Sequence, residues 1–82
     1  MHIFFVAMKR NLLIKFGNRV RELRLSLGLS QEELAARAGV HRTYVGMVER
    51  AEKNITLENI EKLANALEIP IYKLMNLDDL DT

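Results

Sequence analysis

The 82-residue sequence contains no cysteine and no tryptophan, and it has a single proline. Without cysteine the chain has no disulfide to reinforce its core, and a zinc site built on thiolates is excluded. A chain of this length buries only about 60% of the surface that it exposes when unfolded, so its core is small. We therefore expect one domain, with dimerisation as a source of extra stability. The lack of cysteine also suits the reducing cytoplasm, where we expect the protein to act.

A long apolar run is missing as well. The apolar start of the chain is far too short to span a bilayer. Its positive charges, Lys9 and Arg10, follow the apolar segment, whereas those of a signal peptide precede it. We interpret residues 1–10 as an N-terminal extension, either disordered or packed on the domain or a partner. Residues 11–77 form the predicted domain, and residues 78–82 form an acidic tail.

Catalytic and metal-binding motifs are also missing from the sequence. The two histidines, His2 and His41, are far apart in the chain, and no nucleophile–base arrangement stands out. The chain has no Gly-rich phosphate loop. We therefore expect no enzymatic activity, no metal site and no cofactor.

The small net charge of +1 conceals an uneven distribution. Residues 1–53 contain ten Lys/Arg and five Asp/Glu, whereas residues 54–82 contain two Lys/Arg and six Asp/Glu. A basic first part and an acidic last part are compatible with a polyanion bound on one face. Charge alone leaves a chance asymmetry in a soluble domain equally open.

Apolar residues at helical spacing predict an all-α fold, and sustained strand signals are weak. The first helix is expected over residues 12–27, with Gly28 in a left-handed C-terminal cap. The second helix begins at a capping box formed by Ser30 and Glu33, and Gly39 ends it.

Three further helices complete the predicted domain. The third is expected over residues 41–50 and is followed by a loop at residues 51–55. Thr56 caps the fourth helix, and Pro70 opens a short fifth helix. The residues expected to face the core are Leu13, Phe16, Val20, Leu23, Leu27, Leu34, Ala35, Ala38, Val45, Val48, Ile60, Leu63, Ala64, Leu67, Ile71, Leu74 and Met75.

The second and third predicted helices are short and share a tight turn at residues 38–40. Small residues where they meet, Ala35 and Ala38, allow the two helices to cross steeply and closely. This is the geometry of a helix-turn-helix unit, which places its second helix in the major groove of DNA.

A helical wheel places Arg42, Thr43, Gly46, Met47 and Arg50 within one outward arc of about 140°. Arg42 can make a two-pronged bond to guanine, and Thr43 can meet a phosphate or a thymine methyl group. Without a side chain at Gly46 the helix can lie close to DNA, although a tight helix–helix contact explains this glycine equally well. Met47 either contacts thymine methyl groups or is a partly exposed filler.

Gln31 occupies the first position of the second predicted helix. Free backbone amides and the positive end of the helix dipole favour a phosphate there. The side-chain amide can add a further donor, whereas a solvated glutamine is the usual alternative.

The segment GLSQEELAARAGVHRTYVGMVERAEKNITLENIEKLANALEIP, residues 28–70, resembles the Xre-type helix-turn-helix family, which includes the lambda-type phage repressors. Within that family, HRTYVGMVER followed by KNITLENI is most similar to the controller proteins of restriction–modification systems. The resemblance implies a five-helix lambda-repressor-like fold. It also implies a sequence-specific DNA-binding transcription regulator that acts as a homodimer on a pseudo-palindromic operator at its own promoter.

The resemblance also implies roles for single residues. Gln31 would hold a phosphate, and Arg42 would be the main residue that contacts bases. Thr43 and Tyr44 would add contacts to bases or to the backbone. The loop residues expected near the phosphate backbone are Lys53 and Asn54.

Two structural roles follow from the same resemblance. Arg24 and Glu49 would form a buried ion pair between the first helix and the recognition helix, and loss of one partner would cost about 3–5 kcal/mol. Two copies would pair through the fourth and fifth helices. The residues expected in this dimer interface are Ile69, Ile71, Tyr72, Met75 and Leu77.

The chain departs from the family pattern at two neighbouring positions. Ala51 stands where the family usually has glycine, and Glu52 places an acid near the expected phosphate path. The alternatives to a controller are a phage-type repressor, an antitoxin of a toxin–antitoxin pair and, in another class, a protein-interaction (bridging) module. The candidate partners are double-stranded DNA, a second copy of the chain and RNA polymerase, and no membrane partner is expected.

Overall fold

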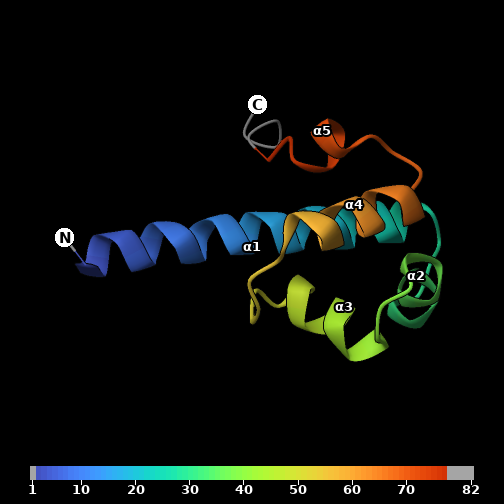
Figure 1. The fold of residues 1–82 in the computed structure, drawn as a ribbon, viewed down its shortest axis with the longest axis horizontal. Coiled ribbons are helices and arrows are strands. Elements are labelled where there is room, and N and C mark those ends of the chain that lie inside the picture. Colours follow the sequence, from blue (N-terminus) through green and yellow to red (C-terminus); the bar gives the residue numbers. More distant parts are fainter. Residues whose placement is uncertain (1, 78–82) are drawn as a thin grey trace.

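The computed structural model describes residues 2–77, with side chains described from residue 11 onward. The predicted acidic tail, residues 78–82, lies outside the described part. Figure 1 shows α1 along the length of the molecule, with α2 and α3 on one side of it and α5 on the other. The helices within residues 2–77 are α1 (His2–Ser26), α2 (Gln31–Ala38), α3 (Arg42–Glu49), α4 (Leu57–Ala66) and α5 (Ile71–Leu74). The predicted all-α fold of five helices is therefore confirmed.

The start of the first helix differs from the prediction. α1 begins at His2, ten residues before the expected start at Leu12. The backbone of residues 2–10 continues the same helix beyond the rest of the domain, so no break marks the boundary expected after residue 10 (Figure 1). The predicted end is correct to within one residue, and Gly28 has the left-handed φ of 71° that the cap requires. None of the described helices has the length and apolarity needed to cross a bilayer.

The local signals for α2 and α3 are all present. The Ser30 hydroxyl accepts a hydrogen bond from the Glu33 N–H at 3.0 Å, and the Glu33 carboxylate accepts from the Ser30 N–H at 2.9 Å. These bonds to the charged form hold the pKa of Glu33 below its ordinary value. Gly39, with φ of 71°, caps the end of α2, and the His41 Nδ1 accepts from the Thr43 N–H at the start of α3.

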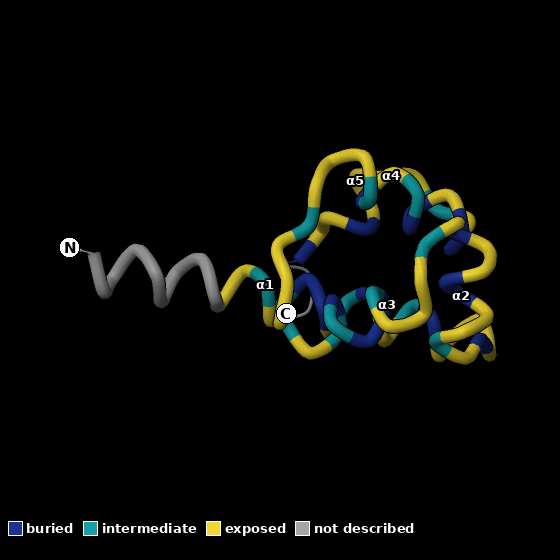
Figure 2. The backbone as a smooth tube through the Cα atoms, turned by 60° about the horizontal axis from the view of Figure 1, so that its bottom comes forward, coloured by how far each residue is buried: buried dark blue, intermediate teal, exposed yellow. Residues whose placement is uncertain are grey.

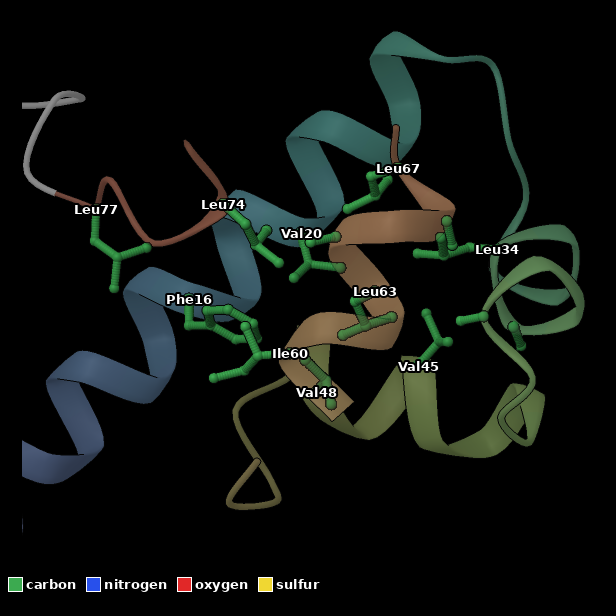
Figure 3. Packing of buried hydrophobic residues seen from close by; sticks show 14 residues of the cluster. Phe16, Val20, Leu34, Val45, Val48, Ile60, Leu63, Leu67, Leu74 and Leu77 are labelled. Atoms are coloured by element: carbon green, nitrogen blue, oxygen red, sulfur yellow. The ribbon is translucent and has the colours of Figure 1, made fainter. Parts of the chain in front are cut away.

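Every helix contributes to one common core. The largest fully buried side chains are Val20, Leu34, Val45, Leu63 and Leu74, one from each helix. They meet in the space enclosed by the five helices (Figure 3). Buried positions occur in every helix, interspersed with exposed ones (Figure 2). The predicted apolar stripes of α2, α3 and α4 are therefore confirmed.

Three expected core residues are instead exposed, and one expected interface residue is buried. Leu27 lies just past the end of α1, where the chain has already turned away. α5 has only four residues, so it buries Leu74 and leaves Ile71 and Met75 exposed. Leu77, expected in the dimer interface, is 7% exposed and belongs to the core of the single chain.

A close contact between α1 and α3 depends on Gly17. A Cβ atom at this position would lie 2.5 Å from the Val48 carbonyl oxygen and 2.8 Å from the Glu49 carbonyl oxygen. Cβ atoms essentially never come so close to backbone oxygens, so only glycine permits this approach. A tight helix–helix contact was one of two explanations expected for Gly46, whereas the structure has such a contact at Gly17.

Candidate nucleic-acid interface

An open cleft of about 560 Å³ lies between the N-terminus of α2 and the outward face of α3. It brings together five of the residues predicted to contact DNA, which come from both helices of the helix-turn-helix unit and from the residue that follows α3. The residues that line it are Arg24, Ser30, Gln31, Glu32, Arg42, Thr43, Gly46 and Arg50.

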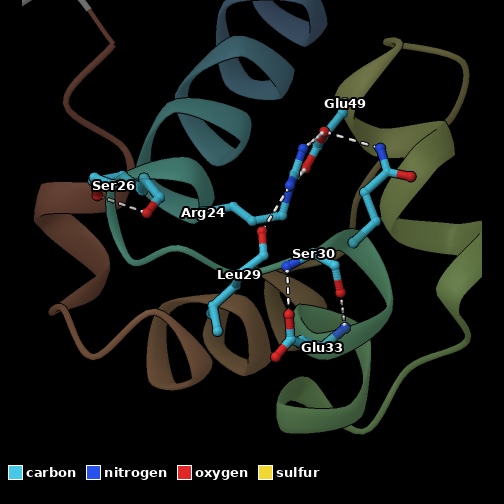
Figure 4. A network of polar contacts seen from close by, with 8 residues as sticks. Arg24, Ser26, Leu29, Ser30, Glu33 and Glu49 are labelled. Atoms are coloured by element: carbon cyan, nitrogen blue, oxygen red, sulfur yellow. Dashed lines mark hydrogen bonds and ion pairs between the residues drawn. The ribbon is translucent and has the colours of Figure 1, made fainter.

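A buried polar network fixes the floor of this cleft (Figure 4). The Arg24 Nε and Nη2 donate to the two carboxylate oxygens of Glu49 at 2.7 and 3.0 Å, and its Nη1 donates to the Leu29 carbonyl at 2.8 Å. The Glu49 side chain is only 3% exposed. Its hydrogen bonds raise the pKa of Arg24 above the ordinary value. The structure thus contains the ion pair between α1 and α3 that the family resemblance implies.

Gln31 extends this network to α2. Its Nε2 donates to the Glu49 Oε1 at 3.1 Å, so the amide points inward and is half-buried. The Glu33 N–H donates to the Ser30 hydroxyl, whereas the Gln31 and Glu32 N–H groups have no acceptor within the helix and can donate to a phosphate. The side chain of Gln31 therefore holds α2 against α3.

Arg42 and Thr43 stand exposed at the start of α3. The Arg42 Nη1 lies 3.2 Å from the Glu32 Oε2, and both side chains are about 70% exposed. A single ion-pair contact between such exposed groups contributes at most about 1 kcal/mol. Arg42 can therefore leave Glu32 for an acceptor on a base at little cost.

Arg50 lies back along the outward face of α3, over Gly46. Its Nη1 is 3.0 Å from the place where a Cβ atom at position 46 would stand. Its Nε and Nη2 donate to the Glu52 Oε2 and Oε1 at 3.0 and 3.2 Å. This pairing raises the pKa of Arg50 above its ordinary value. Gly46 therefore leaves room for the head of Arg50, an explanation that the helical wheel did not offer.

The turn after α3 brings Glu52 beside Arg50. Ala51 has a left-handed φ of 59°, the conformation that favours glycine, which the family usually has at this point. The Glu52 N–H returns to the Met47 carbonyl at 2.8 Å, and the Ala51 N–H returns to the Val48 carbonyl at 3.0 Å. These two bonds define a Schellman motif, which reverses the chain directly after the helix.

The other predicted contact residues lie outside the cleft lining. The Tyr44 hydroxyl accepts a hydrogen bond from the Asn59 Nδ2 at 3.0 Å, and this bond ties α3 to α4. Met47 is half-buried. Lys53 and Asn54 are exposed in the loop between α3 and α4.

The residues predicted for a dimer interface fall into an exposed group and a group that packs in the core. Ile71, Tyr72 and Met75 are exposed on and directly after α5, and Tyr72 is the most exposed of them at 72%. Ile69 packs partly against the core, and Leu77 is buried in it. Among the described residues, no three His, Cys, Asp or Glu side chains come together as a metal site.

Comparison with known proteins adds a second kind of evidence. Residues 20–74 match the Helix-turn-helix family. The chain is 44% identical over 70 residues to the control protein C.BamHI of Bacillus amyloliquefaciens, covering 84% of this chain and 86% of that protein. It is 48% identical over 64 residues to the control protein C.SmaI of Serratia marcescens, covering 78% and 76%. The solved structure of the restriction-modification controller protein C.AhdI from Aeromonas hydrophila matches with a TM-score of 0.74 at 56% identity, covering 76% of this chain and 94% of that chain.

Proposed function

The chain belongs to the Helix-turn-helix family, and on that premise we propose that it is a sequence-specific DNA-binding transcription regulator, the controller protein of a restriction–modification system. The observation that carries this proposal is the polar outward face of α3, where Arg42, Thr43 and Arg50 border one open cleft. An apolar face at this position would instead favour a protein-binding module. The similarity to the control proteins C.BamHI and C.SmaI, and to the restriction-modification controller protein C.AhdI, supports the controller assignment.

The geometry supports a specific mode of binding. α3 enters the major groove, and Arg42 exchanges Glu32 for the O6 and N7 acceptors of a guanine. The backbone N–H groups at the start of α2 bind a phosphate, and so fix the register of the protein on the duplex. Lys53 and Asn54 approach the next stretch of phosphate backbone from their loop.

We also propose that two copies bind together. The exposed apolar side chains of Ile71, Tyr72 and Met75 form the surface for a second copy on the α5 side of the molecule. A two-fold dimer binds a pseudo-palindromic operator whose half-sites lie about one helical turn apart. At its own promoter in the cytoplasm, such a dimer has RNA polymerase as a further partner.

Selection from a random duplex library, followed by fluorescence anisotropy with the selected duplex, tests this function. We expect one consensus with two related half-sites, and about a thousandfold preference over a scrambled duplex of equal length. Affinity should fall with salt, since phosphate contacts release counterions. A protein that enriches no sequence and binds both duplexes equally would contradict the proposal.

Arg42→Ala tests the main base contact. We expect it to weaken binding to the selected duplex by about 1–3 kcal/mol and to relax the preference at one base position in each half-site. Arg37→Ala is the matched control, because Arg37 is also exposed and paired with an acid, Glu68 at 3.6 Å, but lies outside the cleft lining. Equal discrimination by Arg42→Ala and the parent would show that another residue contacts the base.

A further inference from the structure

The guanidinium group of Arg50 is held in place by the chain itself. Most long exposed side chains move among rotamers, and ordering one on binding loses entropy. The Arg50 guanidinium instead lies over Gly46 and is paired along one edge with the Glu52 carboxylate. The turn at Ala51 holds Glu52 in this place.

Gly46 provides the surface beneath the guanidinium. A Cβ atom there would lie 3.0 Å from the Arg50 Nη1 and 3.6 Å from its Nη2, so any larger residue would displace the group. The same position lies 3.5 Å from the Gln31 Oε1, and both residues line the cleft. The Arg50 side chain therefore extends from the end of α3 back over Gly46, and it lines the same cleft as the N-terminus of α2.

Glu52 occupies one edge of the guanidinium. Its two oxygens accept from Nε and Nη2, which is the two-pronged geometry of a strong arginine–carboxylate pair. A guanidinium group carries five N–H donors, and this pairing uses two of them. The edge between Nη1 and Nη2 keeps two parallel donors, the number that a guanine accepts through O6 and N7. Arg50 can thus bind Glu52 and a base at the same time.

The local charge balance also favours a role for Arg50 that depends on its donors more than on its charge. Residues 31–53, which include α2, α3 and the following loop, contain four Lys/Arg and four Asp/Glu. Arg50 and Glu52 neutralise each other on this surface. An exposed pair of this kind adds little to the stability of the fold. A paired arginine also attracts phosphates less than an unpaired one does. The contribution of Arg50 to DNA binding should therefore depend more on its oriented donors than on its charge.

We propose that Glu52 is a positioning residue for DNA recognition: it orients the Arg50 guanidinium over Gly46 toward a base and cancels its charge. Arg50 then contributes to discrimination between sequences and adds little to general attraction for DNA. This inference rests on the proposed function, because it needs a specific duplex that Arg50 can help to discriminate.

The test compares Glu52→Ala with the parent in binding to the duplex selected by the parent and to a scrambled duplex of equal length. The ratio of the two affinities should fall about tenfold, and affinity for the scrambled duplex should rise. The slope of log affinity against log salt should steepen by about one, because one more positive charge is available to phosphates. Glu58→Ala is the matched control, since it removes an acid that is also exposed and paired, here with Lys62 on α4.

Two further variants separate orientation from charge. Arg50→Lys keeps the positive charge but loses the planar group with two donor edges, so its affinity ratio should also fall about tenfold. Glu52→Ala in an Arg50→Ala background should lower the ratio no further, because the residue that Glu52 positions is then missing.

Each outcome bears on the inference. If Glu52→Ala binds both duplexes more tightly by the same factor, Glu52 only repels phosphates and the positioning role is wrong. If Glu52→Ala changes neither affinity, the ion pair has no part in recognition and the inference is again overturned. If the parent itself enriches no sequence, the proposed function fails and the inference fails with it. A parent that enriches a consensus while Glu52→Ala keeps its affinity ratio overturns the inference alone.

Discussion

At the scale of single residues, two turns hold side chains in an unfavourable backbone conformation. Ala51 and Glu68 have left-handed φ values of 59° and 62° directly after α3 and α4. In each turn the next N–H bonds back to the helix, from Glu52 to Met47 and from Ile69 to Ala64. A residue with a Cβ atom loses about 1–2 kcal/mol in this conformation. Both turns therefore store strain that glycine would not have.

We predict that Ala51→Gly stabilises the protein. Relief of about 1–2 kcal/mol of strain exceeds the roughly 0.4–1 kcal/mol by which glycine favours the unfolded chain. The net gain should lie between about 0 and 1.6 kcal/mol, measured as the free energy of unfolding in urea. Ala36→Gly, at an exposed position inside α2, is the control and should destabilise by a similar amount. A lower stability of Ala51→Gly than of the parent would contradict the strain argument.

At the scale of helices, α1 and α3 are joined by a backbone approach and by a polar network. Gly17 brings the two helices together where the carbonyl groups of Val48 and Glu49 lie. The same end of α3 carries the Glu49 carboxylate, to which Arg24 of α1 donates. The C-terminal end of α3 is therefore fixed to α1 both by close backbone packing and by an ion pair.

Two glycine substitutions should have opposite effects on stability. Gly17→Ala forces a Cβ atom against two backbone oxygens of α3, and overpacking of this kind typically costs about 1–3 kcal/mol. Gly46→Ala meets the flexible end of Arg50 closely and Gln31 at ordinary contact distance, and alanine gains up to about 1 kcal/mol of helix propensity. Thermal unfolding followed by circular dichroism distinguishes the two. Equal melting temperatures for both variants would show that α1 and α3 can separate without loss of stability.

The helices were predictable wherever their signals are local. The start of α2 is marked by the capping box of Ser30 and Glu33, and its end by the glycine cap at Gly39. Both signals lie within a few residues of the helix end that they mark, so the sequence alone indicates them. The contact of Gly17 with α3 joins residues about thirty positions apart, and no neighbouring residue indicates it. The pairing of Arg50 with Glu52 escaped a helical wheel, because a wheel assumes that each side chain points straight outward.

At the scale of the whole molecule, the positive charge is concentrated on α1. Residues 9–24 contain six Lys/Arg and one Glu, whereas residues 31–53 contain equal numbers of each sign. The helix-turn-helix unit is thus nearly neutral. We therefore expect its contacts to select a sequence, and the first helix to supply most of the long-range attraction for DNA.

We predict that Tyr72→Glu disrupts the proposed dimer. Tyr72 is 72% exposed, so a charge there should leave the fold of one chain intact while preventing apolar contact with a second copy. Analytical ultracentrifugation should show monomers, and affinity for a duplex with two half-sites should fall toward that for a single half-site. Leu57→Glu is the control, because Leu57 is also a strongly exposed apolar residue, at the start of α4. Dimers that persist in Tyr72→Glu but not in Leu57→Glu would place the interface elsewhere.

The convergence of donors on Glu49 has a consequence for the thermodynamics of binding. Arg24 from α1 and Gln31 from α2 both donate to this one carboxylate at the end of α3. The recognition helix therefore cannot roll about its own axis without breaking bonds to both neighbours. The three helices should enter the groove as a preformed rigid body, so that association orders only a few long side chains. Binding should then show a small heat-capacity change, without the large signature of coupled folding.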